Sequence, residues 1–104
     1  MRLIVALTAV MFSLPGFAQT FPSKSIRWIV PFPPGGPTDT FSRAAAQKLS
    51  EVVKQPVIVE NRAGAGAAIG MEALAKSPPD GYTIGLSTTG SHAINPHLYA
   101  KLAY

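Results

Sequence analysis

The sequence predicts an α/β fold built on a parallel sheet, and three observations predict it. Short apolar runs rich in β-branched residues alternate with segments of helical spacing, in the order strand, helix, strand, helix, strand. Such alternation is typical of a parallel sheet with right-handed crossovers. A glycine- or threonine-rich loop follows each apolar run, and 104 residues suffice for one small domain or part of a larger one.

The first strand is predicted at Ile26–Val30, which is apolar except for Arg27. A helix is predicted at Asp39–Val53, with Thr38 or Asp39 as its N-cap. Gln55-Pro56 ends this helix. The apolar residues at helical spacing, which we expect to face the core, are Phe41, Ala45, Leu49 and Val52.

The second half of the chain repeats the alternation. Val57–Val59 is the second predicted strand, and the alanine-rich segment Ala67–Lys76 is a shorter helix. A turn at Pro78–Gly81 leads into a third strand at Tyr82–Ser87. Asn95-Pro96 is suited to begin a final short helix, with proline at its first position.

The composition places the chain among globular proteins and excludes several chemistries. Hydrophobic residues make up 47% of the sequence and charged residues 13%, which argues against disorder. The sequence has no cysteine, which excludes disulfides, thiolate nucleophiles and cysteine-based metal sites. The net charge of +4 comes from scattered residues, so no nucleic-acid partner is predicted. Two histidines are too few to predict a metal site, and no cofactor is expected.

The first residues have the pattern of a secretory signal peptide. Arg2 precedes an apolar run over residues 3–12, and a proline and small residues up to Ala18 follow. The run is shorter than the roughly 20 residues that span a bilayer. A buried N-terminal helix or a membrane anchor is the alternative. We expect residues 1–18 to be a cleaved signal peptide and residues 19–104 to be exported.

The three loops at 31–39, 61–66 and 88–95 each follow a predicted strand. Because the carboxyl ends of parallel strands share one edge of the sheet, we expect the loops to converge there. Ligands of open parallel sheets bind outside that edge. The sequence therefore predicts a binding site formed by the three loops.

The first loop turns a strand into a helix, and helix N-termini offer unpaired N–H groups and partial positive charge to an anion. Its candidate ligand-binding residues are Phe32, Gly35, Gly36, Thr38 and Asp39. Thr38 would donate its hydroxyl, whereas Asp39 would cap the helix or accept a bond from a ligand ammonium or hydroxyl. The alternative is a stiff strand-to-helix connection that binds nothing.

The second loop contains Gly64, Ala65 and Gly66, which would allow the backbone to approach a ligand closely. The glycine spacing through Gly70 is one residue longer than a dinucleotide fingerprint. We therefore favour a small ligand, or tight helix packing at Gly70. Just before this loop, Asn61 is expected to hold the loop shape.

The third loop offers hydroxyl groups and an imidazole. The segment G-L-S-T-T-G over residues 85–90 departs from the nucleophile elbow, and His92 has no acidic neighbour in the sequence. We interpret Ser87, Thr88, Thr89 and His92 as hydrogen-bond donors to a ligand. The alternative is that the hydroxyls satisfy local backbone groups and His92 packs under the loop.

Several motifs together resemble the substrate-binding receptors of tripartite tricarboxylate transporters, the Bug family of extracytoplasmic solute receptors. The segments that carry the resemblance are Phe21–Arg27, Ile29–Asp39, Gln55–Gly66, Pro78–Thr83 and His92–Tyr99. Alanine stands at Ala63 and Ala103, where the family usually has proline, and at Ala67, where it often has glycine.

The resemblance implies the first part of domain 1 of a type II-like periplasmic binding protein, with the second domain absent and the chain a fragment. It implies a periplasmic receptor, not an enzyme, that captures a small organic anion for membrane transporter subunits. It adds Pro34 and Ala63 to the residues around the ligand carboxylate. The alternatives are an exported α/β hydrolase-like enzyme, or an orphan ligand sensor with the same fold.

Overall fold

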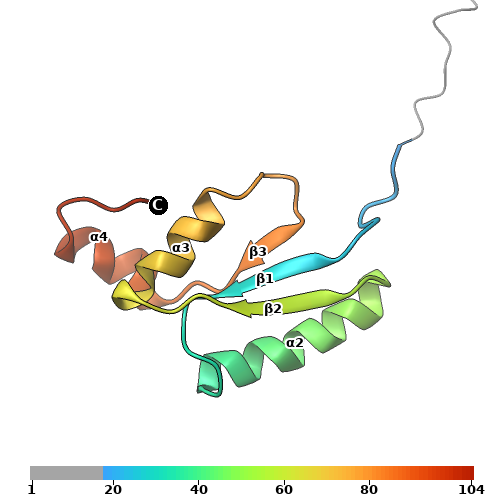
Figure 1. Cartoon of the computed structure of the whole chain (residues 1–104), viewed down its shortest axis with the longest axis horizontal. Coiled ribbons are helices and arrows are strands. Elements are labelled where there is room, and N and C mark those ends of the chain that lie inside the picture. Colours follow the sequence, from blue (N-terminus) through green and yellow to red (C-terminus); the bar gives the residue numbers. More distant parts are fainter. Residues whose placement is uncertain (1–17) are drawn as a thin grey trace, which may run out of the picture.

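The computed structural model describes residues 18–104, and its centre is a sheet of three parallel strands (Figure 1). β1 (Ile26–Val30) lies between β2 (Val57–Asn61) and β3 (Thr83–Gly85), so the strand order is β2-β1-β3. The predicted α/β class and the strand–helix alternation are confirmed. The predicted signal peptide, residues 1–18, lies outside the described residues apart from Ala18.

Two helices lie on opposite faces of the sheet (Figure 1). α2 (Pro37–Val53) packs against β1 and β2, and α3 (Ala68–Ala75) packs against β1 and β3. The central strand is therefore covered on both sides, and Ile29 and Val30 are 1% and 0% exposed. Burial on both faces explains why this strand is almost continuously apolar in sequence.

β2 runs two residues further than predicted. Glu60 pairs with Ile29 and Asn61 pairs with Val30 in the ladder with β1. Glu60 accepts hydrogen bonds from Arg27 of β1 and from Arg62. β3 is shorter than predicted, although the backbone bond from Leu86 N–H to the Ile29 carbonyl extends its alignment with β1.

α2 begins at Pro37, two residues before the predicted start, and its N-cap is Gly36. The prediction that Thr38 or Asp39 caps this helix was wrong. Proline fits the first helical position, since its φ is already helical and its missing N–H would have no partner there. Asp39 consequently lies in the first turn of the helix, where its carboxylate accepts the Gly35 N–H.

The buried face of α2 also differs from the prediction. Phe41 and Val52 are 63% and 77% exposed, whereas Ser42 and Ala46 are buried against the sheet. Small side chains on this face let the helix approach the sheet closely, and the buried Asp39 sets its rotation. The predicted apolar stripe was therefore wrong at Phe41 and Val52, although Ala45 and Leu49 at its border are half-buried.

A single 3-10 turn, η1 (Ala65–Ala67), precedes α3, which lies within one residue of the predicted helix at each end. The predicted tight packing at Gly70 is confirmed: a Cβ there would lie 2.6 Å from Pro31 Cβ and 2.8 Å from the Arg62 carbonyl oxygen. Gly70 thus lets α3 contact the end of β1.

The segment after β3 is helical over more of its length than predicted. A wide helical turn, η2 (Gly90–Ile94), runs directly into α4 (Asn95–Leu98), although residues 88–95 were predicted to be a loop. The final helix does begin at Asn95-Pro96, as predicted. Between residues 18 and 104, none of the helices is both long and apolar enough to cross a bilayer.

Candidate functional site

The three predicted loops meet at one edge of the sheet, which Figure 1 shows at the beginnings of α2 and α3 beside α4. Two asparagine side chains connect them. Asn61 Nδ2, at the end of β2, donates to the Phe32 carbonyl at 3.1 Å. Asn95 Nδ2, at the start of α4, donates to the Gly66 carbonyl at 2.8 Å. The expected convergence at the carboxyl edge is confirmed, and we call this region the carboxyl-edge rim.

A polar network under the first loop is centred on Asp39, which is 4% exposed. Its Oδ2 accepts the Gly35 N–H at 2.9 Å and the Arg43 Nε–H at 3.0 Å. Its Oδ1 accepts Asn61 Nδ2 at 2.9 Å, and Arg43 Nη2 donates to Asn61 Oδ1 at 3.0 Å. The Asp39 carboxylate is thereby fully engaged within the protein. It holds the first loop, the end of β2 and the first turn of α2 together.

The same network controls the ionisation of Asp39. Hydrogen bonds from Arg43, from the Gly35 amide and from Asn61 favour the carboxylate and lower the pKa of Asp39 from 3.8 to about 2. Asp39 is consequently ionised at neutral pH, and the positive charge of Arg43 lies beside it. This part of the rim carries an internal ion pair instead of an unpaired charge.

The first loop covers the Asp39 network, and part of the loop is exposed to solvent. Pro34 and Gly35 are exposed, Phe32, Gly36 and Thr38 are half-buried, and Asp39 is buried. Gly35 has a φ of +89°, which glycine adopts without strain. The first N–H groups of α2, which belong to Thr38 and Asp39, have no partner within the helix and lie at this edge.

The second loop has an unusual backbone. Four successive residues have positive φ: Gly64 at +130°, Ala65 at +49°, Gly66 at +60° and Ala67 at +77°. Alanine rarely adopts such angles, and residues in sparsely populated conformations concentrate at binding and active sites. Ala63, Gly64, Ala65 and Gly66 are all exposed at the rim, although the Gly66 carbonyl accepts the hydrogen bond from Asn95.

The third segment is organised by a buried serine. Ser91 is 0% exposed; its Oγ donates to the Thr88 carbonyl at 2.9 Å and accepts the Thr88 N–H at 3.0 Å. The Tyr104 hydroxyl donates to the Ser91 carbonyl at 2.7 Å and accepts Asn95 Nδ2 at 3.0 Å. Thr88 is half-buried, while Thr89 and His92 are exposed on the rim.

Sequence reasoning missed four residues that shape this edge: Arg43, Ser91, Asn95 and Tyr104. Arg43 follows Asp39 by four residues, the spacing at which side chains on a helix meet, and that signal was available. The roles of Ser91, Asn95 and Tyr104 depend on contacts between segments far apart in the chain. No local pattern indicates such contacts.

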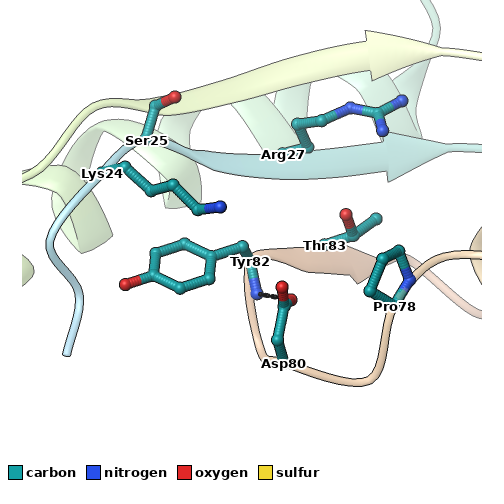
Figure 2. A pocket seen from close by; sticks show the side chains of 7 residues that line it. All are labelled: Lys24, Ser25, Arg27, Pro78, Asp80, Tyr82 and Thr83. Carbon is teal, nitrogen blue, oxygen red and sulfur yellow. Dashed lines mark hydrogen bonds between the residues drawn. The ribbon is translucent and has the colours of Figure 1, made fainter. Parts of the chain in front are cut away.

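A hollow of 280 Å³ lies away from the rim, at the amino ends of β1 and β3 (Figure 2). Several of its polar groups already have partners within the protein. Lys24 Nζ lies 4.5 Å from the centre of the Tyr82 ring, Asp80 Oδ1 accepts the Tyr82 N–H, and Arg27 pairs with Glu60. Residues 18–104 contain no cluster of three or more side chains suited to hold a metal ion.

The three-stranded parallel sheet with helices on both faces places the chain among α/β proteins, whose ligands commonly bind at the carboxyl edge of the sheet. The family described as the tripartite tricarboxylate transporter family receptor matches residues 41–104. The chain belongs to this family, and the resemblance found in the sequence is confirmed. The family consists of solute receptors.

Individual relatives agree with this assignment. A UPF0065 protein of Bordetella pertussis is 42% identical over 104 residues, which are 100% of this chain and 32% of that protein. Protein BugT of the same organism is 52% identical over 77 residues, 74% of this chain and 24% of the relative. The chain therefore spans about a third or less of the length of these relatives.

Solved structures share the fold. The Rhodopseudomonas palustris protein Rpa4515, solved with adipate, is 38% identical with a TM-score of 0.76, over 81% of this chain and 28% of that one. MatC from Rhodopseudomonas palustris, solved with bound malate, is 37% identical with a TM-score of 0.76, over 81% of this chain and 29% of that one. The arrangement of strands and helices in this chain is thus shared with part of each of these proteins.

Proposed function

We propose that this chain supplies the first carboxylate-binding loops of an extracytoplasmic receptor that captures a small organic anion. The observation that carries the proposal is the convergence of three loops at the carboxyl-edge rim, held together by Asn61 and Asn95. Membership of the receptor family supports it, as do similar proteins solved with adipate and malate, both dicarboxylates. The ligand-binding residues are the rim residues named from the sequence.

The anion is captured by neutral donors. Both arginines nearest the rim are already paired, Arg43 with Asp39 and Arg62 with Glu60. A ligand carboxylate therefore meets the free N–H groups of the first turn of α2, the exposed backbone of the second loop, and hydroxyl groups such as that of Thr38. Because dipoles and not unpaired cations hold the anion, we expect affinity to depend weakly on salt.

The receptor binds its ligand without reaction. The Ser87–His92 pair is the one observation that favours a hydrolase, since the Ser87 Oγ and His92 Nδ1 are 2.7 Å apart. A hydrolytic triad places a carboxylate on the second ring nitrogen of its histidine. Within residues 18–104, His92 has no carboxylate as a hydrogen-bond partner. Turnover of an ester by the purified chain would favour the hydrolase.

The location and the partners of the receptor complete the proposal. A signal peptide over residues 1–18 directs the protein to the periplasm, and the receptor passes its ligand to membrane transporter subunits. Mass spectrometry of the exported protein is expected to find Gln19 as the first residue. Two membrane-protein genes beside this one would favour transport over an orphan sensor, whereas a kinase gene would favour the sensor.

Calorimetry with malate, adipate and tricarboxylates tests the binding proposal. We expect heat of binding with at least one carboxylate. We also expect Thr38→Val to weaken binding roughly threefold to tenfold, the usual effect of losing one hydrogen bond. Thr83→Val is the matched control, because Thr83 lies at the amino-edge hollow (Figure 2). No heat across the panel, or equal losses in the two variants, would contradict the proposal.

A further inference from the structure

Three side chains just beyond β3, those of Ser87, Ser91 and His92, form a hydrogen-bonded group that we call the hydroxyl–imidazole cluster. His92 Nδ1 lies 2.7 Å from Ser87 Oγ and 3.2 Å from Ser91 Oγ. Within residues 18–104, the other ring nitrogen of His92, Nε2, has no hydrogen-bond partner, and the residue is exposed at the rim. The ring is therefore held through one nitrogen only.

The donors in the cluster can be assigned from the bonds of Ser91. The single hydroxyl proton of Ser91 is directed at the Thr88 carbonyl, 2.9 Å away, and its oxygen accepts the Thr88 N–H. When His92 Nδ1 carries no proton, the hydroxyl group that can donate to it is therefore that of Ser87. A neutral imidazole that accepts a hydrogen bond at Nδ1 carries its own proton on Nε2.

The same geometry suits the protonated ring. When Nδ1 also carries a proton, it donates to the Ser87 oxygen, because a hydroxyl group accepts as well as it donates. The other titratable neighbour is Tyr104, whose ring centre lies 6.4 Å from that of His92. The Tyr104 hydroxyl is occupied by Ser91 and Asn95. Nε2 therefore presents an N–H group both in the protonated ring and in the neutral ring whose Nδ1 accepts the Ser87 proton.

We propose that Ser87 is a positioning residue that holds His92 with an N–H group at Nε2, directed at an acceptor oxygen of the bound anion. The proposal rests on the proposed function and deepens it. It separates the roles of neighbouring residues: His92 contacts the ligand, Ser87 acts through His92, and Ser91 fixes the backbone beneath both. The Nε2–H group of His92 would therefore select an anion that has another oxygen acceptor besides its first carboxylate, namely a second carboxylate or a hydroxyl group.

Nitrogen NMR of the labelled 104-residue chain tests the positioning without any ligand. We expect the two-bond correlations of His92 to show a proton on Nε2 and a free Nδ1 acceptor in the neutral ring. Ser87→Ala should shift this pattern toward a mixture of tautomers, and Ser87→Thr, which keeps the hydroxyl, should restore it. Ser77→Ala removes a hydroxyl that bonds Ala73 on α3 and should leave His92 unchanged.

Two spectra would overturn the positioning. One is a proton on Nδ1 in the parent chain, and the other is an unchanged His92 pattern in Ser87→Ala. The backbone amide spectrum of each variant shows whether it is folded. If Ser87→Ala fails to fold, the parent and Ser87→Thr spectra still decide the question.

A double-mutant cycle with malate as the probe tests the link to the ligand. We expect Ser87→Ala to weaken malate binding roughly threefold to tenfold and His92→Ala to weaken it at least as much. The double variant should bind no more weakly than His92→Ala alone, because Ser87 acts through His92. Additive losses would overturn the proposal. If the parent chain binds no carboxylate of the calorimetry panel, the proposed function and the ligand role of His92 fail together, while the tautomer spectra still decide the role of Ser87.

Discussion

Asn61 Nδ2 donates a hydrogen bond to Asp39 Oδ1 at 2.9 Å and so fastens the end of β2 to the first turn of α2. The same amide group donates to the Phe32 carbonyl at 3.1 Å, so one side chain holds both ends of the first loop. Substitution of Asn61 by alanine removes these bonds and leaves buried acceptors unpaired. We expect Asn61→Ala to destabilise the fold by roughly 1–2 kcal/mol, measured by urea unfolding.

Hydrogen exchange distinguishes a local from a general effect of Asn61→Ala. The Gly35 amide, which donates to Asp39, should exchange faster in the variant, whereas amides of α3 should change only in proportion to global stability. Unchanged exchange in the first loop would show that Asn61 does not hold it.

The lowered pKa of Asp39 predicts an acid-sensitive fold. Its folded-state pKa is about 2 and its ordinary value is 3.8. A depressed pKa means that the ionised carboxylate stabilises the fold above pH ~4, and that this contribution is lost as the pH falls toward about 2. The pKa of Glu60 is also lowered, chiefly by its hydrogen bond from Arg27, and acts in the same direction.

Thermal unfolding from about pH 6 to about pH 2 measures this dependence. We expect the melting temperature of the parent chain to fall steeply below pH ~4. Asp39→Asn should begin from a lower melting temperature at the upper end of this interval and fall less across it, since only the remaining carboxylates titrate. Parallel curves for the two proteins would show that Asp39 is not the group responsible.

Two serines that are equally buried but differ in their hydrogen bonds should respond oppositely to alanine substitution, one gaining and the other losing stability. Ser42 and Ser91 are each 0% exposed. Among residues 18–104, Ser42 Oγ has no hydrogen-bond partner, whereas Ser91 Oγ bonds both backbone groups of Thr88. We expect Ser42→Ala to raise the free energy of unfolding by up to about 1 kcal/mol and Ser91→Ala to lower it by roughly 1–2 kcal/mol. Urea unfolding of both variants checks the contrast, and destabilisation of similar size in both would contradict it.

Substitution of Gly70 by alanine is expected to cause a steric clash, whereas the same substitution at Gly36 is not. A Cβ at Gly70 would meet backbone atoms of Pro31 and Arg62 within 2.8 Å, whereas one at Gly36 meets nothing nearer than 3.9 Å. We expect Gly70→Ala to destabilise the fold by about 1–3 kcal/mol because α3 must move away from β1. Gly36→Ala is the control and should cost far less in the same unfolding measurement.

The elements were predictable where local chemistry decides them. The β-branched run at Ile26–Val30 and Asn95-Pro96 at a helix start each indicated the observed element. The rotation of α2 was not predictable, because its apolar residues Phe41 and Val52 suggested one buried face while Asp39 imposes another. Hydrophobic periodicity places charged residues on the exposed face of a helix, so it does not predict that the Asp39 carboxylate is buried. The burial is explained by the hydrogen bonds that Asp39 makes with Arg43 and Asn61.

The rim was predictable in outline only. Parallel strands force their carboxyl ends to one edge, so the convergence of the loops followed from the order of elements. The bonds that hold the rim together, such as those of Asn95 to Gly66 and Tyr104 to Ser91, join segments distant in sequence. Neither side chain carries a local signal of its partner.

Mapping of backbone amide shifts on adding malate or adipate tests the central claim most directly. The account predicts the largest changes at Gly35–Asp39, Gly64–Ala67 and Thr88–His92, with little change at Lys24 and Tyr82 beside the amino-edge hollow. Shifts concentrated at that hollow, or none at saturating concentrations of either anion, would contradict it.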